Sequence, residues 1–180
     1  RYWRYDLSCD LQDTERKAAQ MKPIRVDRTC YRIGDKPLYL NSGEFHYFRV
    51  PRKDWKHRMR LFKEAGGNCL ATYIPWAIHE PEEGRFVFDA DEHTHLEQFL
   101  ETAADMGLYI MARPGPYQYS ELLYAGLPGW LLKKYPKILA RTYNGQTMRF
   151  FSASYVHPVF LKKSKIWYDR ICPVIAPYTV

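Results

Sequence analysis

Three glutamates lie at the ends of apolar runs or just beyond them, and each is accompanied by aromatic residues. Glu44 lies in SGEFHYFRVP, Glu80 in YIPWAIHEPEEG and Glu121 in RPGPYQYSELLYAGLP. Carboxylates accept hydrogen bonds from hydroxyl groups, and flat aromatic rings cover the C–H faces of a sugar. The accompanying aromatic residues are Tyr47, Phe48, Tyr73, Trp76, Tyr117, Tyr119 and Tyr124. If the three segments meet in the fold, this combination of side chains suits a carbohydrate.

Each glutamate also has a purely structural explanation. Glu44 could form an ion pair with Arg49 or Arg113, and Glu80 could fix a turn in the segment HEPEEG. Glu121 is the strongest candidate for a functional group, because three prolines and two glycines shape its loop and tyrosines surround it.

Other kinds of site have weaker support in the sequence. His93 and His95 are two residues apart and would face different sides of a helix, and the remaining histidines show no metal-ligand spacing. Neither Ser42 nor Ser120 lies in the G-x-S-x-G pattern of a nucleophilic serine. We therefore expect no bound metal and no cofactor.

Three short apolar runs are expected to position the glutamates. They cover residues 38–45, 69–76 and 108–115, and their length and their branched and aromatic side chains predict buried strands. Each run leads into a segment with helical spacing of apolar residues. Parallel strands joined by right-handed helical crossovers are the arrangement that this alternation predicts.

The helices between and after these strands are indicated by three apolar stripes. The stripes are Trp55, Met59 and Phe62; Leu96, Phe99, Leu100, Ala103 and Met106; and Phe160, Ser164, Trp167, Ile171 and Ile175. We expect the first helix to begin near Asp54, and the second to have Asp89 or Asp91 as its N-cap. The residues expected to end the helices are Gly66, Gly67, Gly107 and Pro177.

The spacing of the strands favours a barrel. The predicted strand ends near Phe45, Ile74 and Ala112 bracket the ~31 residues per unit of a (β/α)8 barrel of ~250 residues. A doubly wound sheet is the alternative, but no G-x-G-x-x-G or G-x-x-x-x-G-K-[ST] pattern follows a strand. The alternating residues on both sides of Gly34 predict a β-hairpin before the first strand, which we expect to close the bottom of the barrel. Residues 1–23 are expected to form an N-terminal arm.

Composition and charge narrow the class of protein. Hydrophobic residues make up 46% of the 180 residues, and no apolar stretch is long enough for a membrane span. The net charge of +7 arises after residue 128, where lysines and arginines outnumber acids. A solvated helix face accounts for this surplus more simply than nucleic-acid binding. The four cysteines show no C-x-x-C pair, and no signal peptide is visible, so reduced thiols and a cytoplasmic location are expected.

Four segments in this order, SGEFHYFRVP, TYIPWAIHEPEEGRFVF, RPGPYQYSE and GLPGWLL, resemble the first three β/α units of the glycoside hydrolase family 35 β-galactosidases. The resemblance implies a partial TIM (β/α)8 barrel over residues 24–180 and a retaining exo-β-galactosidase that releases terminal β-D-galactose. It also implies an acid/base and a nucleophile glutamate on the fourth and seventh barrel strands. Both catalytic glutamates are expected beyond Val180, because the sequence ends where strand four should begin.

The resemblance assigns the sugar-binding side of the site to this chain. Tyr73, in the TYxPW motif, and Glu121, in the RPGPY-x-x-x-E motif, match family positions that bind galactose hydroxyls. Tyr119 and Ser120 replace the family's usual Cys or Asn followed by Ala, so they are candidates for an altered specificity, including a related β-glycoside. Glu80 and Glu44 remain further candidates for substrate binding.

The expected partners are a β-galactoside and the remainder of the barrel, from the same or another chain. Two alternatives remain open at this point. One is a non-catalytic carbohydrate-binding module derived from such a barrel. The other is a small self-sufficient glycosidase that pairs Glu121 with Glu44 or Glu80.

Overall fold

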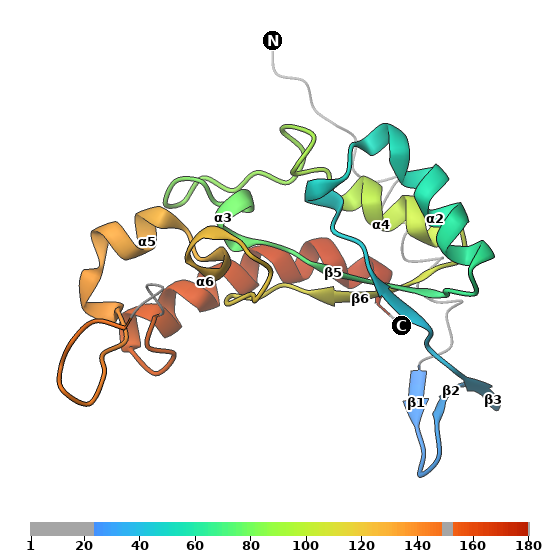
Figure 1. Ribbon diagram of the computed structural model, residues 1–180, viewed down its shortest axis with the longest axis horizontal. Helices are drawn as coiled ribbons and strands as arrows, with labels where there is room; N and C mark the ends of the chain where they lie inside the picture. The colour runs from blue at the N-terminus through green and yellow to red at the C-terminus, as the bar shows by residue number, and fades with distance from the viewer. Residues whose placement is uncertain (1–23, 149–152, 180) are drawn as a thin grey trace.

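The computed structural model describes residues 24–148 and 153–179, so the arm expected over residues 1–23 lies outside the described residues (Figure 1). Its strands are β1 (Ile24–Val26), β2 (Tyr31–Ile33), β3 (Lys36–Leu38), β4 (Ser42–Glu44), β5 (Cys69–Tyr73) and β6 (Tyr109–Arg113). Its α-helices are α2 (Trp55–Glu64), α3 (Trp76–His79), α4 (Leu96–Asp105), α5 (Gly129–Lys134) and α6 (Pro158–Ile175). Its 3-10 helices are η1 (Tyr47–Arg49), η2 (Arg52–Asp54), η3 (Leu123–Gly126), η4 (Pro136–Ile138) and η6 (Ala176–Tyr178).

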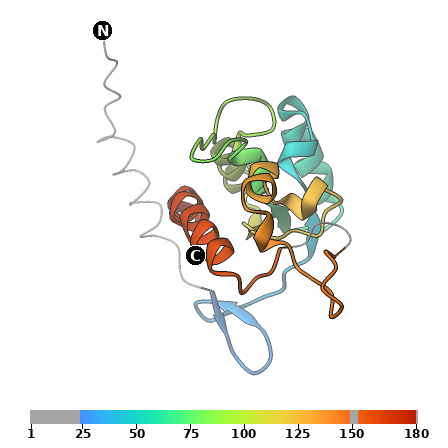
Figure 2. The ribbon, with the colours of Figure 1, turned by 90° about the vertical axis from the view of Figure 1, so that its left-hand side faces the viewer.

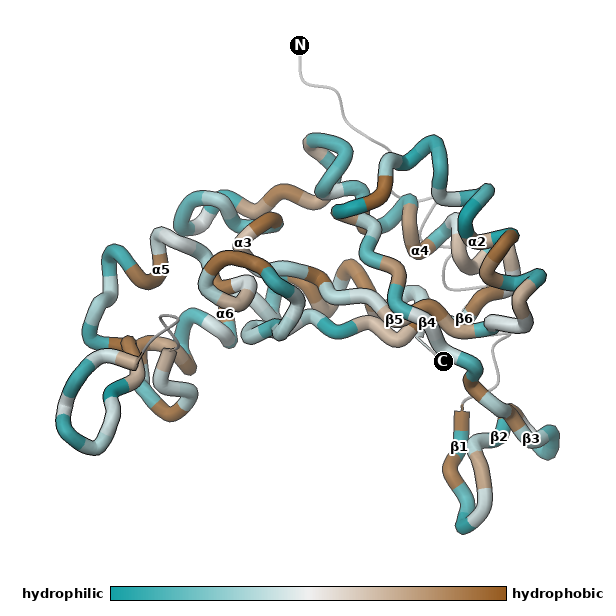
Figure 3. The backbone as a smooth tube through the Cα atoms, viewed as in Figure 1, coloured by the Kyte–Doolittle hydropathy of each residue, from teal (hydrophilic) through white to brown (hydrophobic). Residues whose placement is uncertain are grey.

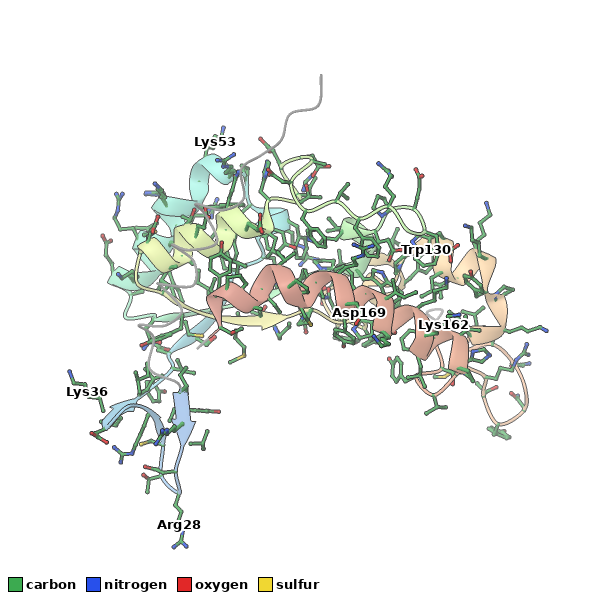
Figure 4. All side chains as sticks on the ribbon, turned by 180° about the vertical axis from the view of Figure 1, so that it is seen from behind. Arg28, Lys36, Lys53, Trp130, Lys162 and Asp169 are labelled. Carbon is green, nitrogen blue, oxygen red and sulfur yellow. The ribbon has the colours of Figure 1, made fainter. Side chains whose placement is uncertain are left out.

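The centre of the fold is a parallel sheet in the order β4-β5-β6. Helix α2 connects β4 to β5, α4 connects β5 to β6, and α6 follows β6. Helix α4 contacts α2 on one side and α6 on the other, so the helices form a layer beside the sheet. Seen from behind, α6 lies across the strands (Figure 4). The predicted alternation of parallel strands and helices is confirmed.

Helix α2 forms where its apolar stripe predicts. Trp55 and Met59, one helical turn apart, are both fully buried. Phe62, a turn further on, is partly buried and packs over two glycines. A Cβ on Gly43, in β4, would lie 2.6 Å from the Phe62 ring, and one on Gly67, between α2 and β5, would lie 2.2 Å from it, so neither position accepts a larger residue while the ring stays in place.

Helix α4 buries the predicted stripe, but its predicted N-cap was wrong. The N-cap is His95, and its side chain makes no capping hydrogen bond. Asp91 instead belongs to the preceding turn, where the Thr94 hydroxyl accepts hydrogen bonds from the backbone N–H groups of Ala90 (2.8 Å) and Asp91 (2.9 Å). The threonine hydroxyl therefore organises the entry to the helix. Gly107, with φ +66, follows the helix end as expected.

Helix α6 carries the third stripe and covers much of the sheet. Phe160, Trp167 and Ile171 on its inner side are buried. The helix begins after His157, whose Nδ1 accepts a hydrogen bond from Val159 N at 3.2 Å. Hydrophobic segments gather along the strands and alternate with hydrophilic ones along the helices (Figure 3). This is the pattern of helices that bury one face.

The N-terminal segment forms a separate small antiparallel sheet in the order β1-β2-β3. The predicted turn at Gly34 joins β2 to β3, and the sheet carries Arg28 and Lys36 away from the main body (Figure 4). The prediction of one strand over residues 38–45 was wrong, because β3 ends at Leu38 and β4 begins at Ser42. The chain between them bonds to Asn68 instead of continuing either strand.

Candidate functional site

The carboxyl ends of the three parallel strands bring together Glu44, Tyr73 and Arg113. Glu44 ends β4, Tyr73 ends β5 and Arg113 ends β6. Tyr73 is the register partner of Arg113 across the β5–β6 ladder. Ligands of parallel α/β sheets bind outside the carboxyl ends of the strands, so these residues lie where a site is expected. Figure 2 views the molecule from the end at which α5 lies.

Arg113 connects the three residues. Its Nη2 donates hydrogen bonds to both carboxylate oxygens of Glu44, each at 2.5 Å. Its Cζ lies 3.8 Å from the centre of the Tyr73 ring, in cation–π contact. Of the two ion pairs considered for Glu44, the structure therefore contains the one with Arg113. The Glu44 side chain is still 56% exposed, so its remaining lone pairs face solvent.

His46, which the sequence analysis did not select, also belongs to this cluster. Its Nε2 lies 3.2 Å from Glu44 Oε2, and its ring stacks on Phe48 with a centroid separation of 5.3 Å. Burial lowers the pKa of His46, and the charges of Arg49 and Arg113 lower it further, while Glu44 and Glu121 raise it. The lowered pKa favours a neutral imidazole at neutral pH. In the sequence, the position of His46 two residues after Glu44, in GEFHYF, was the signal that could have identified it.

The loop after β6 holds Glu121 in an unusual backbone conformation. Glu121 is exposed and has φ +52. Before it, Tyr119 is 81% exposed, whereas Ser120 is buried and its hydroxyl has no hydrogen-bond partner in the described parts of the chain. The Glu121 carboxylate and, more strongly, Glu44 raise the pKa of His46 against the larger lowering by burial.

Side chains from other elements fix this loop. Trp167 Nε1 donates a hydrogen bond to Pro114 O at 2.6 Å, and the Tyr168 hydroxyl donates one to Gly115 O at 2.5 Å. Both donors lie on α6. The Gly115–Pro116 peptide bond is cis. The two hydrogen bonds from Trp167 and Tyr168 therefore tie the start of the loop to α6.

Glu80 is buried, with 2% of its surface exposed. Its Oε2 accepts a hydrogen bond from Trp76 Nε1 at 2.5 Å, and its Oε1 accepts one from Gly84 N at 2.7 Å. Trp130 Nε1 also donates to its backbone carbonyl at 2.8 Å. Both carboxylate oxygens are occupied by the protein, so the geometry favours the loop-fixing explanation of Glu80 over sugar binding.

Three of the aromatic residues expected around a sugar lie in the core instead. Tyr47, Phe48 and Trp76 are at most 4% exposed and pack in the main hydrophobic cluster. The Tyr47 hydroxyl is hydrogen-bonded to His79 Nε2 at 2.5 Å, and burial lowers the pKa of His79 to about 4. These rings pack in the buried core, so their assignment to the sugar-binding surface was wrong.

The described residues offer no grouping of three or more histidine, cysteine or acidic side chains that could hold a metal ion. Over the same residues, every helix is too short or too polar to cross a bilayer.

Comparison with curated proteins gives two informative relatives. The chain is 39% identical over 160 residues to an exo-β-D-glucosaminidase from Pyrococcus horikoshii, a match that covers 86% of this chain and 21% of the relative. It is 43% identical over 120 residues to a β-galactosidase from Pongo abelii, covering 66% of this chain and 17% of the relative. The chain therefore spans about a fifth of the length of the relatives that it matches.

Among solved structures, the chain is similar to a β-galactosidase from Bacillus circulans sp. alkalophilus, with a TM-score of 0.60 and 20% identity. The similarity covers 75% of this chain and 19% of that one, and it extends to the fold alone. The family model of the glycosyl hydrolases family 35 matches residues 31–180, which include β4, β5, β6 and the loop that carries Glu121. This chain belongs to glycosyl hydrolases family 35.

Proposed function

We propose that this chain supplies the sugar-binding part of a retaining exo-β-galactosidase, which releases terminal β-D-galactose. The observation that carries the proposal is the position of Glu121. Glu121 is exposed, and it lies on the loop that follows the carboxyl end of β6 and that Trp167 and Tyr168 tie to α6. A fixed acceptor suits sugar hydroxyls, whose recognition depends on geometry.

Each proposed binding residue has a distinct role. Glu121 accepts hydrogen bonds from galactose hydroxyls, and Tyr73 presents its half-buried ring and hydroxyl beside it. Arg113 keeps the Tyr73 ring in place through the contact at 3.8 Å and holds Glu44 by its ion pair. Ser120 and Tyr119 border the sugar on the loop side, and they are the positions at which this chain departs from the family pattern.

The proposed fold context is the first three β/α units of a (β/α)8 barrel over residues 24–180, with β4, β5 and β6 as barrel strands one to three. The remaining strands would come from the same or another polypeptide. A retaining glycosidase needs two carboxylates ~5–5.5 Å apart, one to protonate the leaving oxygen and one to attack the anomeric carbon. We place both on later strands, beyond Val180, and none of the described residues is assigned a catalytic role.

The geometry argues against a self-sufficient glycosidase made from the glutamates of this chain. Glu80 is buried with both oxygens bonded to protein donors. Both carboxylate oxygens of Glu44 accept hydrogen bonds from the Arg113 guanidinium, which would have to be displaced before Glu44 could act on a substrate. Neither is therefore suited to act with Glu121 as an acid and nucleophile pair.

A β-D-glucosaminide is the second candidate for the substrate. The observation that favours it is the presence of two carboxylates, Glu44 and Glu121, near the proposed sugar position, because a carboxylate attracts the ammonium group of an amino sugar. The relative with 39% identity over most of the chain is named for that activity. Galactose remains the first candidate because of the family's Tyr73 and Glu121 motifs.

The test is a hydrolysis assay on the polypeptide encoded by the complete reading frame that contains these residues, beside the 180-residue chain. The substrates are 4-nitrophenyl β-D-galactoside and 4-nitrophenyl β-D-glucosaminide. We expect galactoside hydrolysis by the complete polypeptide and no turnover by the 180-residue chain. Binding of galactose without hydrolysis by the complete polypeptide would support a non-catalytic sugar-binding module. Turnover by the 180-residue chain would contradict the proposal that this chain binds the sugar and that later strands carry both catalytic carboxylates.

A further inference from the structure

The loop after β6 contains three residues other than glycine with positive φ. These are Glu121 (φ +52), Tyr124 (φ +54) and Ala125 (φ +54). Residues that have a Cβ rarely adopt this left-handed backbone conformation, so surrounding contacts must hold the backbone there. Two of the three are neighbours, and Glu121 stands apart from them.

Gln118 holds the part of the loop around Ala125. Its backbone N–H donates to Ala125 O at 2.9 Å. Its side-chain Nε2 donates to Ile74 O at 2.7 Å and to Arg113 O at 3.2 Å, which ties the loop to the ends of β5 and β6. This half of the loop is therefore fixed from within and from the sheet.

Arg49 holds the part of the loop at Glu121. Its Nη2 donates a hydrogen bond to the carbonyl oxygen of Ser120. That carbonyl belongs to the peptide unit between Ser120 and Glu121. The rotation of this unit about the N–Cα bond of Glu121 is the φ angle of Glu121. Within residues 24–148 and 153–179, no other side chain donates to this peptide unit. The orientation of the Ser120–Glu121 peptide thus depends on one guanidinium.

Arg49 is itself placed for this contact by the segment after β4. It is the last residue of η1, and its Cζ lies 5.4 Å from the centre of the Phe48 ring. Phe48 is buried in the core, so the ring is a fixed support for the guanidinium. The contact between Arg49 and Ser120 spans 71 residues of sequence and connects the loops after β4 and β6.

We propose that Arg49 is a positioning residue for Glu121, an inference that rests on the proposed sugar-binding function. Arg49 bonds to the backbone before Glu121 and forms no ion pair with the Glu121 carboxylate. The carboxylate therefore stays open to sugar hydroxyls, while the backbone that aims it is fixed. A direct ion pair would occupy the acceptor oxygens that the sugar needs.

The experiment is a double-mutant cycle on the complete polypeptide, with the galactose dissociation constant from calorimetry as the readout and kcat/KM measured beside it. The variants are Arg49→Met, Glu121→Gln and the double variant. We expect Arg49→Met to weaken galactose binding about tenfold, and the double variant to bind within about twofold of Glu121→Gln alone, because residues that act as a unit are not additive.

Two further variants separate geometry from charge and from general destabilisation. Arg49→Lys keeps the positive charge but loses the planar fork, so it should weaken binding nearly as much as Arg49→Met. Arg52→Met removes an exposed arginine from the next 3-10 helix, away from the loop, and should leave galactose binding unchanged. Melting temperatures of all variants identify any that do not fold.

The possible failures are distinguishable. If Glu121→Gln does not weaken galactose binding, the proposed function is wrong. If Glu121→Gln weakens binding but both Arg49 variants bind as tightly as the wild type, the positioning role is wrong while the function stands. The positioning role would also be wrong if the fold increases in the dissociation constant of the two single variants multiply in the double variant. Arg49 would then act independently of Glu121.

Discussion

The guanidinium of Arg113 lies over the ring of Tyr73, with Cζ 3.8 Å from the ring centre, while its Nη2 bonds both oxygens of Glu44. One side chain therefore connects the ends of β4, β5 and β6. Gln118 Nε2 adds a second side-chain link at this edge, through Ile74 O and Arg113 O. The contact between Arg113 and Tyr73 explains how the half-buried tyrosine can keep one orientation at an exposed surface.

Replacing Arg113 by methionine should release both partners. We expect the galactose dissociation constant to rise about five- to tenfold and the free energy of unfolding to fall by about 1 kcal/mol, the scale of a cation–π contact with a partly exposed ion pair. Calorimetric titration and urea denaturation measure the two effects. Arg113→Lys should recover the stability only in part, because an ammonium cannot cover the ring and bind a carboxylate in the same way. Unchanged binding in both variants would remove Arg113 from the site.

Ser120 offers a test of the departure from the family pattern. Its hydroxyl is buried without a partner in the described structure, which costs roughly 1–3 kcal/mol when no bond is formed. We expect Ser120→Ala, which restores the family's usual residue, to leave the melting temperature equal or higher and to raise KM for the galactoside a few-fold. A lower melting temperature with unchanged KM would show that the hydroxyl serves the fold alone.

Glu80 should prove to be a structural residue. Glutamine at this position keeps one acceptor oxygen but cannot accept from both Trp76 Nε1 and Gly84 N, so Glu80→Gln should destabilise the protein by about 1–3 kcal/mol. The galactose dissociation constant of the folded variant should not change. Glu82→Gln is the matched control, because the Glu82 carboxylate is exposed and pairs with the exposed Arg85 side chain. Weakened galactose binding at full stability would return Glu80 to the sugar site.

The hydrogen bonds of the Glu83 carboxylate make the free energy of unfolding dependent on pH. Its carboxylate accepts hydrogen bonds from Lys134 Nζ (2.8 Å), Lys163 Nζ (2.5 Å) and the Tyr135 hydroxyl (2.7 Å), which joins the loop before α4 to α5 and α6. These donors, Lys134 first, lower the pKa of Glu83 from 4.5 to about 2. The folded state therefore binds the proton less readily than the unfolded state, and the stabilisation is complete above pH 4.5 and is lost as the pH falls toward 2.

The measurement is urea denaturation of the wild type and Glu83→Gln at pH 6 and at pH 3. Because glutamine does not titrate, the difference in unfolding free energy should be largest at pH 6, roughly 1–2 kcal/mol for a partly exposed network, and smaller at pH 3. A difference that is equal at the two pH values would contradict the role of the Glu83 charge.

Local patterns in the sequence predicted the elements well. The stripes of α2 and α6 and the glycines after α2 define these helices because burial of one face and a left-handed stop are local properties. The N-cap of α4 was wrong because the Thr94 hydroxyl competes for the same backbone groups. Strand 38–45 was wrong because Asn68, which is distant in sequence, bonds the chain between β3 and β4.

The composition of the site was harder to predict. Glu44 and Arg113 were recognised as possible ion-pair partners, and they meet across the end of β5, which lies between their strands. His46 was not assigned a role, and Arg49 was considered only as a partner of Glu44. Arg49 instead bonds to Ser120 O, because the segment after β4 turns toward the loop after β6. Tyr47, Phe48 and Trp76 were placed on the wrong side, because the sequence does not reveal which face of a short helical turn packs inward.

The central claim is that Glu121 binds the sugar, and calorimetric titration of galactose into the complete polypeptide tests it most directly. We predict saturable binding by the wild type and a dissociation constant at least tenfold higher for Glu121→Gln, since a charge-assisted hydrogen bond to a hydroxyl contributes about 1.5–3 kcal/mol. The same dissociation constant for both proteins, at equal melting temperature, would contradict the account.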